Sequence, residues 1–231
     1  MSLLRTVIRI GLFAVLGMIG GTLVGSLIYG SANMVQINYS EINQSYRPVP
    51  PTNPLYAPLL RLSIDNEFFC SGVAISATYA LTAAHCVTGM WGIMTKNLIL
   101  VASSKEEYTG IMAKAVAMDT YRDVALLKGD FSKFQIMPVD FAGETIVNIE
   151  NLSVLSCGFP GGSAAFCSGQ RLAGNDHFKL AGVGGLLQKG MSGGPVTELS
   201  SGKVIGVNSA VASDHNIFGT VLGADEVFGI R

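Results

Sequence analysis

From Leu59 to the end, the sequence is built from short apolar runs separated by Gly, Ser, Asn and Asp. Runs of four to eight residues rich in Val, Ile, Leu and Phe, with turn residues between them, are typical of β-strands. The clearest runs are "LLRLSI", "FFCSGVAIS", "NLILVAS", "DVALLKG", "NLSVLSCG", "GKVIGVNSAVA" and "FGTVLG". One short turn or helix is expected at residues 224–229. Many short strands at regular spacing predict an all-β fold, an antiparallel barrel or sandwich.

Residues 10–29 contain no charged side chain and are long enough to cross a bilayer as a helix. Arg5 and Arg9 precede this run and all 16 acidic residues follow it, so the rest of the chain is expected on the extracytoplasmic side. The length favours an uncleaved anchor, because a signal peptide has an apolar core of only about 7–15 residues. A cleaved signal peptide is the alternative, since Gly30 and Ala32 form a small-x-small site. Cleavage would give a secreted or periplasmic protein, whereas an uncleaved anchor would give a single-pass membrane protein.

Three glycines recur every four residues within the apolar run, a spacing that lets two membrane helices approach closely. They are Gly17, Gly21 and Gly25, and they predict a possible self-association. The next segment, residues 31–58, is polar and rich in proline, which favours an extended spacer. The sequence therefore predicts an anchor or signal peptide at 1–30, a linker at 31–58 and one domain at 59–231.

The charge of the chain after the apolar run, which we call the exported part, limits the partners that the domain can bind. Without Arg5 and Arg9 this part has 13 basic and 16 acidic residues, a net charge of −3, and no basic cluster that would bind nucleic acid. Four cysteines lie in this part, where disulfides persist, and they allow three pairings. They are Cys70, Cys86, Cys157 and Cys167. No metal or other cofactor is expected, because the His and Cys spacing does not supply the three or four ligands of a zinc site.

Three short stretches carry the residue types of nucleophilic catalysis. His85 lies in "TAAHC", Asp123 directly precedes the apolar run "VALL", and Ser192 lies in "KGMSGGP". A serine nucleophile needs an imidazole that takes its proton and a carboxylate that orients the imidazole. The glycines around the serine allow a tight turn that directs backbone N–H groups at one point. Asp119 is the rival carboxylate, but it does not stand directly before the apolar run.

In the order "TAAHC", "DVALL", "GMSGGP", the chain resembles the chymotrypsin/trypsin-like serine proteases from about Leu59 to the C-terminus. The resemblance implies two perpendicular antiparallel β-barrels of six strands each, with the active site between them. It implies that His85 is the general base, Asp123 its orienting partner and Ser192 the nucleophile. The N–H groups of Gly190 and Ser192 would form the oxyanion hole.

The resemblance extends to the cysteines. "FCSGVAIS" followed by "TAAHC" is similar to the stretches that carry the family's disulfide beside the catalytic histidine, which implies a Cys70–Cys86 bond. A Cys157–Cys167 bond would then remain for the other two cysteines.

The chain departs from the digestive and clotting enzymes at Met191, where those enzymes have an aspartate that pairs with a newly released N-terminus. Methionine cannot form this pair, so we expect no such zymogen switch. In this respect the chain is more similar to bacterial and viral members and to the HtrA branch.

Alignment to the family also predicts the pocket for the P1 side chain, which precedes the scissile bond. Leu186 would lie at its base, while Leu187 and Asn208 argue against a preference for glutamate. With no acidic residue at the base, an apolar or small P1 side chain is expected. The predicted substrate-binding residues are Leu186, Ser209, Ala210 and Gly219.

Two functions are compatible with these residues. The first is a membrane-tethered or exported serine endopeptidase that acts on proteins or peptides through an acyl-enzyme. The alternative is a catalytically inactive binding module with the protease fold at a membrane surface. Retention of all three triad residue types favours the enzyme.

Overall fold

The computed structural model describes residues 47–48, 58–64, 67–88, 93–95, 99–103, 110–143, 149–162, 164–175, 178–212 and 215–229. No helix within these ranges is long and apolar enough to cross a membrane. The apolar run at 10–29 and its three glycines lie outside the described residues, as do most residues of the 31–58 segment.

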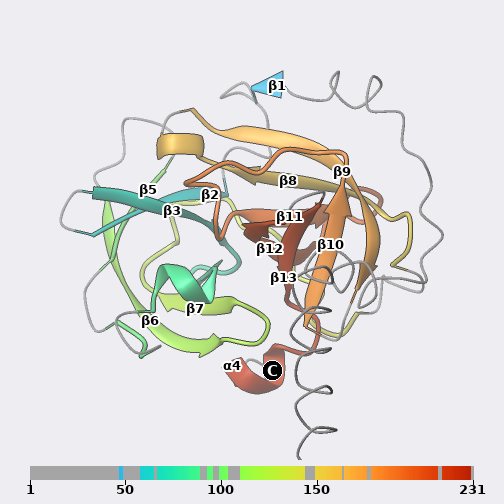
Figure 1. Cartoon of the computed structure of the whole chain (residues 1–231). Helices are drawn as coiled ribbons and strands as arrows, with labels where there is room; N and C mark the ends of the chain where they lie inside the picture. Colours follow the sequence, from blue (N-terminus) through green and yellow to red (C-terminus); the bar gives the residue numbers. More distant parts are fainter. Residues whose placement is uncertain are drawn as a thin grey trace, which may run out of the picture. The chain divides into compact units, whose positions relative to one another are not determined.

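Six antiparallel strands form a closed barrel in the order β2-β3-β4-β7-β6-β5 (Figure 1). Their bounds are β2 (Leu59–Ile64), β3 (Glu67–Ala74), β4 (Tyr79–Thr82), β5 (Ile99–Ser103), β6 (Ile111–Asp119) and β7 (Val124–Lys128). Leu60, Leu81 and Leu127 are fully buried in its core. In β7 the first four residues are all buried, so a continuous apolar run rather than an alternating one marks this strand.

The second half of the described chain forms a seven-stranded antiparallel sheet, β1-β9-β10-β13-β12-β11-β8, in which β8 also pairs with β9. The sheet is therefore barrel-like (Figure 1). The strands are β1 (Arg47–Pro48), β8 (Ser153–Gly158), β9 (Phe166–Asn175), β10 (Lys179–Val183), β11 (Pro195–Glu198), β12 (Val204–Val211) and β13 (Asn216–Thr220). The predicted all-β class is confirmed, with two barrel-like sheets. The short helix expected near the end is also confirmed, as α4 (Asp225–Phe228).

Contacts between the two sheets bring the ends of their strands together. Val204 and Val207 of β12 pack into the core cluster of the barrel, while Leu59 of β2 belongs to a cluster with Cys157 of β8 and Phe159, which follows β8. At the same junction the backbone N–H of Ser71 donates to a carbonyl of the second half at 2.7 Å. The loops that carry the predicted catalytic residues lie along this junction.

Candidate active site

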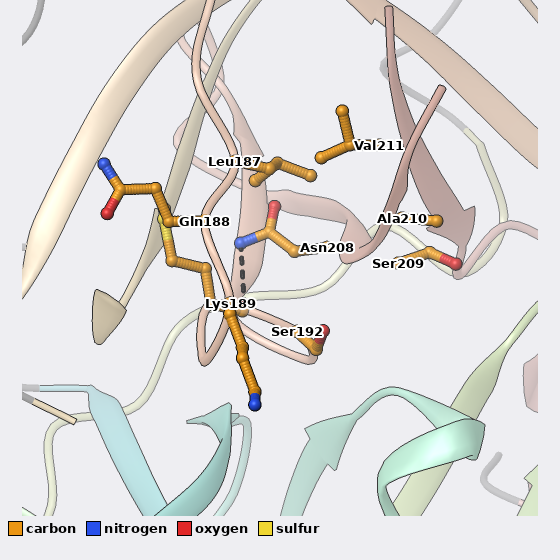
Figure 2. Close-up of a pocket in the computed structure, with 9 residues that line it drawn as sticks. Leu187, Gln188, Lys189, Ser192, Asn208, Ser209, Ala210 and Val211 are labelled. Atoms are coloured by element: carbon orange, nitrogen blue, oxygen red, sulfur yellow. Dashed lines mark hydrogen bonds between the residues drawn. The ribbon is translucent and has the colours of Figure 1, made fainter. Parts of the chain in front are cut away.

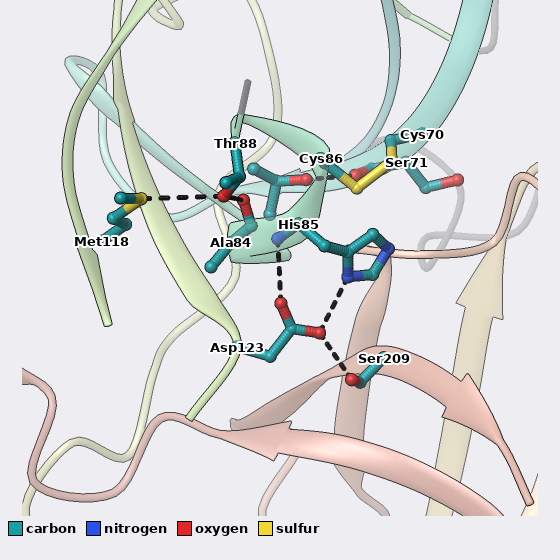
Figure 3. Close-up of polar contacts among 10 residues, drawn as sticks. Cys70, Ser71, Ala84, His85, Cys86, Thr88, Met118, Asp123 and Ser209 are labelled. Carbon is teal, nitrogen blue, oxygen red and sulfur yellow. Dashed lines mark hydrogen bonds and ion pairs between the residues drawn. A yellow bond between two sulfur atoms is a disulfide. The ribbon is translucent and has the colours of Figure 1, made fainter. Parts of the chain in front are cut away.

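His85 lies in a one-turn 3-10 helix, η3 (Ala84–Cys86), which follows strand β4. The Cys70–Cys86 disulfide joins this turn to β3 across a Cα–Cα distance of 6.1 Å. The imidazole Nδ1 lies 2.8 Å from Oδ2 of Asp123, and the backbone N–H of His85 donates to Oδ1 of Asp123 at 2.9 Å (Figure 3). One carboxylate therefore fixes both the main chain and the ring of His85.

Asp123 lies in the turn before β7 with a φ angle of +56°, in the left-handed region that aspartate tolerates better than most residues. Its Oδ2 also accepts a hydrogen bond from Ser209 Oγ at 2.5 Å. Burial by itself would raise the pKa of Asp123, but the hydrogen bonds from His85 and Ser209 and the nearby imidazole outweigh burial and lower the pKa. The group is therefore ionised at neutral pH and holds the proton of the imidazole on Nδ1.

The rival carboxylate, Asp119, has other partners. Its Oδ1 accepts the backbone N–H groups of Tyr121 and Arg122, each at 2.9 Å, and its Oδ2 forms an ion pair with the Arg122 guanidinium. Arg122 also donates to the carbonyl of Leu222 at 3.1 Å. Asp119 therefore closes the turn that leads to Asp123 and has no bond to His85.

Ser192 lies in the loop between β10 and β11, which we call the nucleophile loop (residues 188–194). Gly193, with φ +81°, places this loop against the segment before His85: a Cβ on Gly193 would lie 2.1 Å from Thr82 Oγ1 and 2.7 Å from the Ala83 nitrogen. The close approach requires glycine, because any other residue would meet both the clash and an unfavourable φ. Ser192 is also fixed through its carbonyl, which accepts the backbone N–H of Ser71 at 2.7 Å.

The orientation of the Gly190 N–H is set by the carbonyl that precedes it. The carbonyl of Lys189 accepts the N–H of Gly161 at 2.9 Å, and all described peptide bonds are trans. In a trans peptide the C=O and the following N–H point in opposite directions. The N–H of Gly190 therefore points away from Gly161. On the other side of the residue, Ser71 Oγ donates to the carbonyl of Gly190 at 2.7 Å.

The Ser192 N–H is oriented in the same way. The carbonyl of Met191 accepts the N–H of Gly194 at 3.0 Å and Nδ2 of Asn208 at 3.1 Å. Within the part of the chain that the structure describes, the N–H groups of Gly190 and Ser192 donate to no acceptor. Two oriented and unused N–H groups beside a serine are what stabilisation of an oxyanion requires.

A cavity of about 180 Å³ opens beside Ser192 (Figure 2). The predicted residues Ser209 and Ala210 line it. Gln188, Lys189 and Val211 also line it, although no pattern in the sequence predicts them. The full lining is Leu187, Gln188, Lys189, Met191, Ser192, Asn208, Ser209, Ala210 and Val211.

Two predicted pocket residues lie elsewhere. Leu186 is 52% exposed and does not line the cavity; its N–H donates to Ser168 Oγ at 3.2 Å, and the next residue, Leu187, takes the lining position. Gly219 lies in β13, where an added Cβ would be 2.1 Å from the carbonyl oxygen of Arg122. It therefore supports the backbone of the turn that carries the carboxylate rather than the wall of the pocket.

Both disulfides implied by the resemblance are present. Cys70 is bonded to Cys86, and Cys157 is bonded to Cys167, which joins neighbouring positions of β8 and β9. His85 lies close to the Cys70–Cys86 disulfide. The two sulfur atoms of this disulfide are bonded to each other and provide no thiolate for a metal.

Two barrel-like sheets, with an imidazole–carboxylate pair on one and a serine in a glycine loop on the other, define a chymotrypsin-like serine protease. Residues 70–207 match the family model of the trypsin-like peptidase domain, and the chain belongs to this family of serine endopeptidases. A comparison with curated protein sequences finds no match.

Solved structures share the fold at low sequence identity. A Glu endopeptidase has 16% identity and a TM-score of 0.68, over 80% of this chain and 95% of that one. The active form of the Rv3671c protease from M. tuberculosis has 20% identity and a TM-score of 0.60, over 79% and 86%. A serine endoprotease from Yersinia pestis has 19% identity and a TM-score of 0.55, over 82% and 64%.

Proposed function

We propose that this protein hydrolyses peptide bonds with Ser192 as nucleophile, His85 as general base and Asp123 as the group that orients the base. The observation that carries the proposal is the double contact of Asp123 with the ring and the main chain of His85. It leaves Nε2 of the imidazole without a partner among the described residues, so Nε2 can accept the proton of a serine hydroxyl.

In the proposed reaction, Ser192 Oγ attacks the carbonyl carbon of the scissile bond while its proton passes to Nε2 of His85. The negative charge on the carbonyl oxygen is stabilised by the N–H groups of Gly190 and Ser192. The imidazolium then donates its proton to the leaving amine, and an acyl-enzyme forms. Water, deprotonated by His85, releases the acyl group and restores the hydroxyl of Ser192.

The proposed enzyme needs no newly released N-terminus. Met191 is fully buried, and Gly158 packs against it so closely that a Cβ there would lie 2.8 Å from the Met191 Cα. Apolar packing and hydrogen bonds to the flanking carbonyls hold the nucleophile loop, in place of an amino–carboxylate pair.

Labelling with a fluorophosphonate tests this function directly, because only an activated serine reacts quickly. We expect one covalent adduct, and peptide mapping by mass spectrometry should locate it on Ser192. Absence of labelling, with the chain folded by circular dichroism, would favour the inactive binding module.

A small apolar P1 side chain is the proposed specificity. The cavity is smaller than the roughly 300 Å³ at which small-molecule pockets begin, and Leu187 and Val211 are part of its lining. Lys189 adds a positive charge to the lining, but its side chain is exposed, and an exposed ion pair contributes only about 0–1 kcal/mol.

We therefore predict that peptides with Ala or Val at P1 have a kcat/KM at least about tenfold above that of peptides with Glu, Lys or Arg, because burying an unpaired charge is costly. Lys189→Met should change kcat/KM for the Ala peptide by less than about threefold. Steady-state kinetics on a matched peptide series measures both. A preference for Glu that disappears in Lys189→Met would contradict the proposal and assign an acidic P1 residue.

The proposed location is the extracytoplasmic side of a membrane, with residues 1–30 as anchor, 31–58 as spacer and 59–231 as peptidase. Two disulfides support an oxidising compartment, and residues 10–29 are apolar behind Arg5 and Arg9. Detection of a peptide from 10–29 in the membrane fraction would support the anchor, and a mature N-terminus near Ser31 would support cleavage. An intact chain in the cytosol would contradict both.

A further inference from the structure

Asn208 is a fully buried polar residue of β12 whose main chain is bonded to the nucleophile loop. Its N–H donates to the carbonyl of Gly194 at 2.8 Å, and its carbonyl accepts the N–H of Gly193 at 2.8 Å. These two bonds hold the residues that follow Ser192 on the edge of β12.

The side chain of Asn208 is fully used as well. Its Nδ2 donates to the carbonyls of Cys157 at 2.7 Å and Met191 at 3.1 Å, and its Oδ1 accepts from Ser156 Oγ at 2.6 Å. Figure 2 shows Asn208 beside the nucleophile loop. Carbonyl oxygens only accept hydrogen bonds, so the NH2 group must face them and the orientation of the amide is fixed. With both amide protons on carbonyls, the neutral side chain of Asn208 links strand β8 to the nucleophile loop.

The Met191 carbonyl is the one that determines where the Ser192 N–H points. If the Met191–Ser192 peptide rotated, its carbonyl would enter the oxyanion hole and the Ser192 N–H would leave it. Rotation would also break the bond from Nδ2 and leave a buried donor unpaired, which costs about 1–3 kcal/mol. The amide of Asn208 therefore favours the peptide orientation that catalysis needs.

The Cys157 carbonyl connects Asn208 to the other N–H of the hole. Cys157 lies one residue before the end of β8, close to the segment that carries Gly161, and the Gly161 N–H holds the carbonyl of Lys189. Gly194 packs directly on the carbonyl of Cys157, where an added Cβ would be 2.0 Å away. One amide therefore braces both segments that orient the hole.

We propose that Asn208 is a positioning residue of the oxyanion hole, a neutral substitute for the charged pair that Met191 cannot form. This inference rests on the proposed peptidase function. The groups hydrogen-bonded to the Asn208 side chain are the Ser156 hydroxyl and the backbone carbonyls of Cys157 and Met191, and none of them titrates. The hydrogen bonds of the Asn208 amide therefore do not depend on the protonation of any partner group.

Asn208→Asp tests the proposal, because it keeps the shape and replaces the NH2 donor by an acceptor. The carboxylate would repel both carbonyls and attract the Ser192 N–H, which inverts the peptide. We expect kcat to fall by about 10²–10³-fold, the effect of losing one oxyanion donor, with KM changed less than about threefold. Asn208→Leu, which removes the donor without adding an acceptor, should lose less.

A pH series separates positioning from structural damage. The introduced carboxyl group is buried, which raises its pKa, and its protonated form can donate one hydrogen bond again. The ratio of kcat in Asn208→Asp to kcat in the wild type should therefore rise as the pH is lowered. A destabilised scaffold would give a ratio that stays flat or falls.

The matched control is Asn216→Asp, another buried asparagine on the neighbouring strand β13. Its Nδ2 donates to Gln170 Oε1 at 2.8 Å and to the Gly185 carbonyl at 3.0 Å. Nε2 of Gln170 has no partner among the described residues, so rotation of that amide can satisfy a carboxylate. We expect kcat within about threefold of the wild type.

The outcomes separate the two proposals. A wild-type chain that neither labels with fluorophosphonate nor cleaves peptides would overturn the peptidase function. A wild-type chain that labels and cleaves, with Asn208→Asp equally fast, would overturn only the role of Asn208. The role of Asn208 would also be overturned if Asn208→Asp raised KM while kcat stayed unchanged, or if Asn216→Asp lowered kcat as much as Asn208→Asp does. If Asn208→Asp does not fold, the expected result for Asn208→Leu is a lower kcat at unchanged KM, and an unchanged kcat overturns the role.

Discussion

Ser192→Ala is expected to lower kcat for peptide hydrolysis by about 10⁴-fold or more, because no other group can form the acyl-enzyme. KM should change little, since the hydroxyl contributes a single small group to the cavity. The carbonyl of Ser192, which accepts the N–H of Ser71, is a backbone atom and is kept in the variant. Thermal unfolding should therefore be close to that of the wild type. Stopped assays with long incubation measure the residual rate.

Ser132→Ala is the matched control for this prediction. Ser132 lies on an exposed turn of the barrel and donates to Asp130, far in sequence from the nucleophile loop. Its kcat should equal that of the wild type. Undiminished hydrolysis by Ser192→Ala would show that the activity resides in another serine or in a contaminating protease.

The all-β class could be predicted because the strands that form the cores are the most apolar. Strand β7 appears in the sequence as a continuous apolar run, and both β7 and β8 were expected at nearly their observed positions. Strands β6, β9 and β10 were not expected. Their sequences, "IMAKAVAMD", "FCSGQRLAGN" and "KLAGV", contain exposed or polar positions, and the last two also contain glycines, so that pairing with neighbouring strands decides their conformation.

The reactive residues of the site could also be predicted, because each of them lies in a short motif that can be recognised in the sequence. The groups that hold those residues were not foreseen, because they come from distant parts of the chain. Ser209 was expected only as a substrate-binding residue, yet it donates to Asp123 across 86 positions. The Gly161 N–H and the amide of Asn208 act on carbonyls of the nucleophile loop, and a sequence gives no sign of such bonds.

Position in the sequence relative to Ser192 was not sufficient to identify the residues that line the pocket. Leu186 was selected by its distance from Ser192 in sequence, but the turn at Gly184, with φ +89°, and the bond from the Leu186 N–H to Ser168 bring Leu187 into the lining. A one-residue difference of this kind changes which side chain faces the cavity. Loop conformation therefore determines specificity residues that the strand pattern leaves open.

Asp123→Asn is expected to lower kcat by about 10⁴-fold near pH 7, an effect that follows from the imidazole tautomer. Two donors, the His85 N–H and the imidazole N–H, bind different oxygens of the carboxylate. If the single carbonyl oxygen of asparagine keeps the bond to the His85 backbone, its NH2 group faces Nδ1. Nδ1 must then accept, the proton moves to Nε2, and Nε2 can no longer take the proton of Ser192.

Asp119→Asn is the matched control, because it makes the same chemical change in a carboxylate bonded to Arg122 rather than to the imidazole. It should reduce thermal stability while kcat stays within about threefold of the wild type. The hydrogen bonds from His85 and Ser209 lower the pKa of Asp123 below its ordinary value, so the wild-type carboxylate stays ionised between pH 5 and 8 and the pH profile there should contain no step from this group. Loss of kcat in Asp119→Asn with full activity in Asp123→Asn would exchange the roles of the two carboxylates, and the double contact with His85 would then be purely structural.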